Sequence, residues 1–187
     1  EGYTALIEKL RDHAAIRVHL NQRLSRSAGA EFDHLFWSGP LDAYFEHALG
    51  RLQYRTLTFE RFDEIGDYQG NPVINYCQES VGWTRISEHK HFAPWETHEP
   101  TVCYREFSKL AEPNDIPYYP LRLQDDKSLL RAYMDLAETA SNVTFIGRLG
   151  TYRYLDMHVV IGESLDLARR CKESAPAAWP KFSAAPL

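Results

Sequence analysis

The spacing of hydrophobic residues along the chain switches several times between the 3.6-residue period of a helix and the two-residue period of a strand. Leu6, Ile7 and Leu10, for example, recur at helical spacing near the start of the chain. From this spacing we predict helices over residues 3–12, 41–49, 126–140 and 156–170, and strands over residues 16–20, 33–37, 52–59, 73–77, 83–90, 101–107 and 143–147. We therefore expect a mixed fold.

The stretch from residue 52 to residue 107 is rich in aromatic and β-branched residues and is divided by turn signals such as Gly66-Asp67 and Ala93-Pro94. Short strands separated by such turns are typical of an antiparallel meander. Predicted helices precede and follow this stretch. The fold class is therefore predicted to be α+β or α/β, with an antiparallel sheet in the middle of the chain.

Composition narrows the classes of partner. The chain has 187 residues, of which 44% are hydrophobic, enough to bury one core. Its net charge is −5 with both signs interspersed, which argues against a nucleic-acid partner. No apolar run approaches the roughly 20 residues that cross a bilayer, so we expect no membrane partner. Three cysteines without C-x-x-C spacing indicate a reducing, cytoplasmic location.

Arginine and tyrosine supply the first candidate chemistry. A single arginine on a strand is explained well enough by a carboxylate partner, but several beside tyrosines are typical of a cleft for a diphosphate. Guanidinium groups supply charge and a forked geometry, and phenol hydroxyls add neutral donors. The residues concerned are Arg55, Arg85, Arg105, Arg148, Tyr118, Tyr119, Tyr152 and Tyr154.

A second candidate lies between Phe145 and Ile161, where a predicted strand runs through Gly147 and Gly150 into a helix that starts near Asp156. A strand, a glycine turn and a helix can present backbone N–H groups to a bound cofactor. The same pattern also occurs without any ligand, and spacing alone does not separate the two interpretations.

Histidines raise the question of a metal. His89 and His91 would share one face of a predicted strand, with His98 and Cys103 nearby. A second paired ligand motif is missing, and Glu88 and Lys90 alternate with the histidines as on the polar face of a strand. We therefore expect no metal site.

Four motifs in register carry a family resemblance: F-W-S-G-P-L-D-A-Y-F at 36–45, T-R-I-S-E-H-K-H-F at 84–92, P-Y-Y-P at 117–120, and F-I-G-R-L-G-T-Y-R-Y-L-D-M from Phe145. Together they resemble UDP-galactopyranose mutase, a flavoenzyme that interconverts the pyranose and furanose forms of UDP-galactose. The resemblance runs from about Glu1 to Arg170 and covers what looks like the C-terminal half of that family's chain. Because no G-x-G-x-x-G fingerprint is present, we expect a fragment whose partner is the missing N-terminal half.

The resemblance implies a division of the chain. Residues 1–50 would belong to a FAD-binding domain of Rossmann-like fold, and residues 51–122 would form the antiparallel substrate-side domain. Residues 123–172 would return to the FAD-binding domain, and residues 173–187 would be a flexible tail. An exposed sheet edge would also favour a homo-oligomer.

The resemblance also implies roles for individual residues. Arg55 and Arg85 match arginines that meet the substrate diphosphate, and Tyr119 and Tyr154 match tyrosines that hydrogen-bond the UDP phosphates. Arg148 matches an arginine beside the flavin, and Asp156 matches an acid at the junction of cofactor and sugar. Gly147 and Met157 would line the cofactor site. Arg85, Arg148 and Asp156 would be the catalytic group, while Arg105 and His89 are supported only by lying in matching strands.

The activity so implied is that of an isomerase in galactofuranose biosynthesis for a cell wall or polysaccharide. Reduced FAD would act through a sugar adduct on the flavin N5, with UDP-galactose as substrate. The fragment by itself is expected to be inactive. Two other functions stay open: a non-catalytic remnant that binds a nucleotide sugar or a partner protein, and a different FAD-dependent flavoprotein of the amine-oxidase type.

Overall fold

The computed structural model describes residues 2–29, 31–121 and 126–184. The chain forms two compact units, residues 1–33 and residues 34–187. In the first unit, α1 (Gly2–Arg11) confirms the predicted N-terminal helix, and a short α2 (Arg26–Gly29) follows. The strand predicted over residues 16–20 is wrong: this segment has no regular secondary structure, and Ile16, Val18 and Leu20 are exposed. Alternation alone makes no strand where no neighbour completes the backbone hydrogen bonds.

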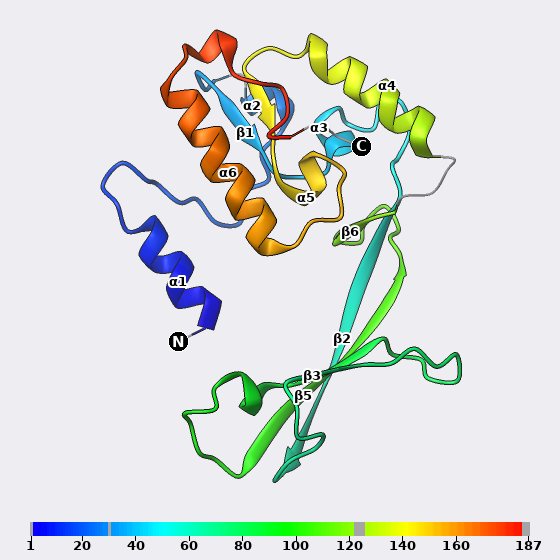
Figure 1. Cartoon of the computed structure of the whole chain (residues 1–187). Coiled ribbons are helices and arrows are strands. Elements are labelled where there is room, and N and C mark those ends of the chain that lie inside the picture. The colour runs from blue at the N-terminus through cyan, green and yellow to red at the C-terminus, as the bar shows by residue number, and fades with distance from the viewer. Residues whose placement is uncertain (1, 30, 122–125, 185–187) are drawn as a thin grey trace. The chain divides into compact units, whose positions relative to one another are not determined.

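The second unit contains a five-stranded antiparallel sheet (Figure 1). Its strands are β2 (Tyr54–Ile65), β3 (Val73–Asn75), β4 (Arg85–Glu88), β5 (Pro100–Leu110) and β6 (Tyr119–Pro120), in the spatial order β3-β4-β5-β2-β6. The four strands predicted in this region are confirmed as β2, β3, β4 and β5, whereas β6 was not predicted. β2 is longer than expected and pairs with β5 along its length, from Arg55 opposite Leu110 to Ile65 opposite Pro100. A meander therefore links only β3, β4 and β5.

The register of this sheet sorts the candidate residues by face, because residues directly opposite each other point the same way. Tyr119 lies opposite Arg55, and Arg85 lies opposite Glu106, which in turn lies opposite Phe59. Phe59 is four residues from Arg55, an even number, so Arg55, Arg85 and Tyr119 share one face. Arg105 lies on the other face.

A small parallel sheet, β1 (Leu35–Trp37) with β7 (Val143–Phe145), carries the C-terminal part of the site. It lies between α4 (Asp126–Thr139) and α6 (Met157–Lys172) (Figure 1). The short helix α5 (Gly147–Gly150) follows β7, and Gly150 is required there because a Cβ would come within 2.6 Å of the Trp37 carbonyl oxygen. These elements confirm a mixed fold with an antiparallel and a parallel sheet.

The hydrophobic core of this unit lies where α3 (Leu41–Tyr44), α4 and β7 meet the base of β2. Its buried residues are Leu41, Tyr44, Phe45, Leu52, Tyr54, Leu130, Tyr133, Ala137, Ala140, Val143, Phe145 and Tyr152. The helix predicted over residues 41–49 ends early, at Tyr44. The chain turns there because Glu46 and His47 adopt positive φ, and the buried Asp42 carboxylate accepts a hydrogen bond from the Leu52 N–H.

The end of the chain contacts β7. The Phe145 N–H donates to the Lys181 carbonyl at 2.7 Å, the Ser183 N–H donates to the Phe145 carbonyl at 2.9 Å, and the Phe145 and Phe182 rings stack with centroids 5.3 Å apart. A 3-10 turn, η2 (Pro176–Ala178), precedes these contacts. The domain division proposed from the sequence, including a flexible tail over residues 173–187, stays a prediction.

Candidate functional site

Three predicted site residues, from two distant segments of the chain, come together at the end of the five-stranded sheet. Tyr119 comes from β6, Arg148 from α5, and Tyr154 from the loop between α5 and α6. The two tyrosine rings stack with centroids 5.3 Å apart at 22°, and the Arg148 guanidinium carbon lies 4.7 Å from the Tyr119 centroid and 5.1 Å from the Tyr154 centroid. We call Arg148, Tyr119 and Tyr154 the Arg–Tyr cluster.

The Arg–Tyr cluster is held by the tight turn that follows β7. Gly147 has φ +69°, a left-handed conformation that favours glycine, and the Thr151 hydroxyl donates to the Gly147 carbonyl at 2.7 Å. The Arg148 guanidinium donates from Nε to the Leu155 carbonyl at 2.9 Å, and its Nη2 donates to the same carbonyl. The turn therefore fixes the charge of Arg148 against the faces of two aromatic rings, one of which, Tyr154, is 59% exposed.

Arg55 adjoins the Arg–Tyr cluster on the same sheet face, because it is the direct cross-strand partner of Tyr119. Its guanidinium donates from Nε to the Ser108 hydroxyl at 2.9 Å and from Nη2 to the Ser108 carbonyl at 3.0 Å. These bonds hold a half-buried cation beside the tyrosines. Arg55, Tyr119, Tyr154 and Arg148 therefore form one continuous group of donors.

Arg85 lies on the same face but farther along it. The register puts it four residues from the Arg55–Leu110 pair, or about 13 Å along the strands, and two strands across. Its Nε donates to the Asn75 side-chain oxygen at 2.9 Å, and its Nη1 lies 3.6 Å from the Glu106 carboxylate. Its side chain is 40% exposed, so Arg85 offers a positive charge at a distance from the Arg–Tyr cluster.

Asp156 and Met157 lie at the start of α6, two and three residues after Tyr154. Asp156 occupies the N-cap position, yet its exposed carboxylate makes no capping hydrogen bond, and Met157 is 56% exposed. A helix N-terminus carries unsatisfied N–H groups. This end of α6 therefore presents an acid, a thioether and N–H donors next to the Arg–Tyr cluster.

The structure separates Arg105 and His89 from this group. Arg105 lies on the opposite sheet face, with its guanidinium carbon 4.2 Å from the Phe62 ring centroid and Nη1 3.5 Å from Glu60. The His89 ring packs on Tyr104, with centroids 5.0 Å apart. Both side chains are explained by packing within their own part of the sheet.

Sequence reasoning missed the residues that hold the arginines: Ser108, Asn75 and Glu106. Each lies on a predicted strand or at its end, but its contact with an arginine depends on which strands pair. The pairing of β2 with β5 carries no sequence signal of its own, since local periodicity reports strands and not their neighbours.

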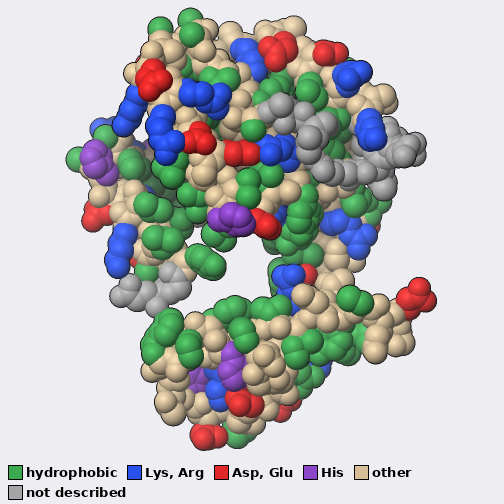
Figure 2. Space-filling model, in the orientation of Figure 1, with side chains coloured by type: hydrophobic (Ala, Val, Ile, Leu, Met, Phe, Trp, Pro, Cys, Tyr) green, Lys and Arg blue, Asp and Glu red, His purple; other side chains and the backbone are tan. Residues whose placement is uncertain are grey.

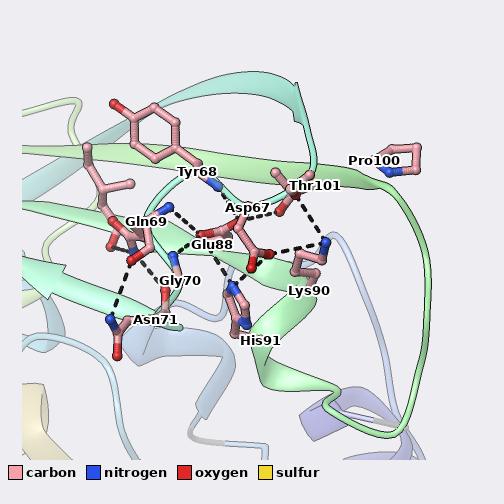
Figure 3. A network of polar contacts seen from close by, with 12 residues as sticks. Asp67, Tyr68, Gln69, Gly70, Asn71, Glu88, Lys90, His91, Pro100 and Thr101 are labelled. Carbon is pink, nitrogen blue, oxygen red and sulfur yellow. Dashed lines mark hydrogen bonds and ion pairs between the residues drawn. The ribbon is translucent and has the colours of Figure 1, made fainter.

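At the other end of the sheet, a buried carboxylate organises a network of polar contacts (Figure 3). Glu88, at the end of β4, is fully buried and accepts hydrogen bonds from the N–H groups of Tyr68, Gln69 and Gly70 at 2.8–3.1 Å. The Thr101 hydroxyl donates to it at 2.9 Å. Three successive N–H groups that converge on one anion form a backbone nest, which ties the turn after β2 to β4.

Part of this network has the residue types of a metal site. Asp67, Glu88 and His91 each offer a ligand atom, and these atoms lie within 4.8 Å of one another. However, the Glu88 oxygens already accept four hydrogen bonds, and the Lys90 ammonium lies 3.2 Å from Asp67. A lysine cation at that distance opposes a second cation.

The expectation that His89 and His91 lie on a strand is wrong, since both belong to the 3-10 turn η1 (His89–Phe92).

We expect Glu88→Gln to destabilise the protein by about 1–3 kcal/mol, because the amide NH₂ would face backbone donors that lose their acceptor. Burial by itself raises the pKa of Glu88, but the Tyr68, Gln69 and Thr101 donors and the charge of His91 outweigh it and place the pKa below its ordinary value of 4.5. A carboxylate whose pKa is lowered in the folded state stabilises the fold at pH values above its ordinary pKa. This stabilisation is lost as the pH falls through the folded-state pKa. Urea unfolding should therefore show the difference between the two proteins at pH 7, and the difference should shrink as the pH falls below 4.5. A difference independent of pH would contradict the charge argument.

Surface charge agrees with the composition. Figure 2 shows acidic and basic side chains interspersed over the face in view, rather than a continuous basic stripe. Among the described residues, no helix is both long and apolar enough to pass through a bilayer.

Comparisons with known proteins agree with the motifs. The profile of the UDP-galactopyranose mutase family matches residues 1–154. A probable UDP-galactopyranose mutase of Klebsiella pneumoniae is 52% identical over 167 residues, which is 89% of this chain and 44% of that protein. The dTDP-fucopyranose mutase of Escherichia coli is 45% identical over 90% of this chain and 47% of that protein. The UDP-galactopyranose mutase of Mycoplasma pneumoniae is 30% identical over 90% of this chain and 46% of that protein. The chain thus spans less than half the length of these relatives.

Proposed function

Because the chain belongs to the UDP-galactopyranose mutase family, we propose that it forms the nucleotide-sugar side of a cytoplasmic enzyme that interconverts UDP-galactopyranose and UDP-galactofuranose. The observation that carries this proposal is the Arg–Tyr cluster continued by Arg55. A diphosphate bears two negative charges and needs several donors at once. The Arg55 guanidinium and two phenol hydroxyls on one surface supply charge-assisted and neutral hydrogen bonds of the required kind, and Arg148 adds a second positive charge beside them.

FAD is the cofactor we propose for this enzyme, and the described residues fit one side of it. The exposed Met157, the N-terminus of α6 and the left-handed turn at Gly147 offer an apolar contact and N–H donors to a planar, polar ring system. Reduced flavin, when bound, supplies the nucleophile for the anomeric carbon of the sugar. Asp156 would lie at the junction of cofactor and sugar, and Arg148 would lie beside the flavin.

The chain's own residues act on the leaving diphosphate. As the bond from the anomeric carbon to the diphosphate breaks, negative charge grows on the phosphate oxygens. Arg55, Tyr119 and Tyr154 would hold these oxygens in place, and Arg85 would add a positive charge farther along the same face. Donors fixed before the reaction stabilise such charge without reorganisation. The held diphosphate can then return to the rearranged sugar.

One finding favours a second candidate substrate: the 45% identity to a dTDP-fucopyranose mutase. Both nucleotide sugars contain a diphosphate, and the Arg–Tyr cluster suits either one. The choice between them depends on contacts with the base and the sugar.

A chimera tests the proposal. We would join this chain to the N-terminal half of the Klebsiella pneumoniae relative, and assay the reduced enzyme with UDP-galactofuranose and with dTDP-fucofuranose. We expect turnover of the UDP sugar by the chimera and none by this chain alone, because the chain supplies only part of the site. A folded, flavin-loaded chimera that turns over neither sugar but binds UDP would favour the non-catalytic alternative. Oxidase activity without UDP dependence would favour an amine-oxidase-like flavoprotein.

A further inference from the structure

Tyr152 has an unusual backbone conformation for its position in the core. Its φ is +48°, in the left-handed region, and its side chain is 2% exposed. A residue with a Cβ pays about 1 kcal/mol or more for this conformation, so surrounding contacts must hold it there. Tyr152 lies in the loop that leads from α5 to Tyr154.

The contacts that hold Tyr152 come from the two strands on the other side of the site. Its hydroxyl oxygen lies 2.7 Å from the Gln53 carbonyl oxygen and 2.6 Å from the Leu121 carbonyl oxygen, so its single hydrogen is shared between two acceptors. The Leu121 N–H in turn donates to the Gln53 carbonyl at 2.9 Å, so these two residues extend the pairing of β2 with β6. The Tyr152 ring also meets the Tyr54 ring edge to face, with centroids 5.3 Å apart.

The residues joined by the Tyr152 hydroxyl each lie two positions from a residue of the candidate site. Gln53 is two residues before Arg55, Leu121 is two residues after Tyr119, and Tyr152 is two residues before Tyr154. One hydroxyl therefore connects the loop that carries Tyr154 to the strands that carry Tyr119 and Arg55. The Thr151 and Arg148 hydrogen bonds described above act within the loop, whereas the Tyr152 hydroxyl crosses from the loop to the sheet.

We propose that Tyr152 is a positioning residue for the nucleoside-diphosphate site: its hydroxyl fixes the stacking of Tyr154 on Tyr119, and with it the spacing of the two phenol hydroxyls. The stacking part of this proposal rests on geometry alone, and the diphosphate part rests on the proposed function. Tyr152 itself does not bind the ligand. A residue with a merely structural role would change stability without changing this spacing.

The test is Tyr152→Phe in this chain, with Tyr133→Phe as the matched control. Phenylalanine keeps the ring against Tyr54 and removes only the hydroxyl. Tyr133 is equally buried and its hydroxyl donates to the Gly50 carbonyl, but its contacts lie in the core and not at the Arg–Tyr cluster. In ¹³C-tyrosine-labelled protein, we expect the nuclear Overhauser effects between the Tyr119 and Tyr154 rings to weaken in Tyr152→Phe and to persist in Tyr133→Phe.

Binding of UDP supplies the second readout. We expect Tyr152→Phe to raise the UDP dissociation constant about 3–10-fold, the size of one lost hydrogen bond. In a Tyr154→Phe background the same change should have little further effect, because Tyr152 acts through Tyr154.

Two results would overturn the positioning role: unchanged ring-to-ring effects in Tyr152→Phe, or the same loss in Tyr133→Phe. Additive effects of Tyr152→Phe and Tyr154→Phe on UDP binding would also overturn it. If neither the unaltered chain nor the chimera binds UDP, the diphosphate assignment fails, while the ring-to-ring effects still decide whether Tyr152 fixes the stack.

Discussion

Arg85→Ala is expected to lower the turnover of the chimeric enzyme about 10²–10³-fold, as the loss of a preorganised charge opposite a leaving group commonly does. The Arg85 side chain is 40% exposed on the face that carries Arg55 and Tyr119. Asn75 and Glu106 hold its guanidinium, so its charge is fixed before the substrate arrives. Steady-state rates with UDP-galactofuranose would measure the loss.

The sheet supplies a matched control for Arg85. Arg105 lies opposite Ile86, the neighbour of Arg85 in β4, and therefore points to the other face. Arg105→Ala removes the same charge from an adjoining position, and we expect it to leave turnover within about twofold of the unaltered chimera, since the Arg105 charge faces away from the site. Equal losses in the two variants would show that the face does not matter and would contradict the assignment of Arg85. Flavin absorbance of each variant would confirm that the cofactor is retained.

Asp42→Ala is expected to destabilise this chain by about 3–5 kcal/mol, because it removes the acceptor at the centre of a buried polar group. Asp42 is 1% exposed. One of its oxygens accepts from the Tyr54 hydroxyl at 2.9 Å, and the other accepts from the Leu52 N–H at 3.0 Å and lies 3.0 Å from His47 Nδ1. Burial, and then the charge of Asp42, raise the pKa of Tyr54 well above its ordinary value, so Tyr54 stays a donor at neutral pH.

Asp63→Ala is the control for Asp42. Asp63 also pairs with a neighbour, Arg61, at 2.9 Å, but both side chains are more than half exposed. An exposed pair contributes about 0–1 kcal/mol, so the unfolding midpoint in urea should shift little. If Asp42→Ala shifted the midpoint no more than Asp63→Ala, the loop after α3 would not depend on the buried carboxylate.

Asp42 and Tyr152 both secure the base of β2 and connect the core to the site. The Tyr54 ring packs edge to face with the Tyr152 ring, the Tyr54 hydroxyl donates to Asp42, and the next residue along β2 is Arg55. The same strand thus belongs to the core at one residue and to the proposed diphosphate surface at the next. Side-chain alternation along a strand makes this arrangement possible.

The local elements of this protein follow from residue spacing and composition within each segment. Helical spacing located α1, α4 and α6, and clusters of aromatic and β-branched residues located β2 to β5, because these patterns arise from contacts within one element. The sequence also brought Arg55, Arg148, Tyr119 and Tyr154 forward as candidates through their motifs. The strand predicted over residues 16–20 is wrong because alternation is also a local pattern, and among the described residues no neighbouring strand pairs with this segment.

Which strands pair becomes visible in the folded chain, and this pairing places the residues of the candidate site. The antiparallel pairing of β2 with β5 and β6 puts Arg55, Arg85 and Tyr119 on one face and Arg105 on the other, although all three arginines lie on or beside predicted strands. Strand pairing depends on contacts between residues far apart in the chain, such as Tyr152 with Gln53 and Leu121. Local periodicity carries no information about such contacts, so the stacked tyrosines and the anchor that holds them emerge only when the chain is folded.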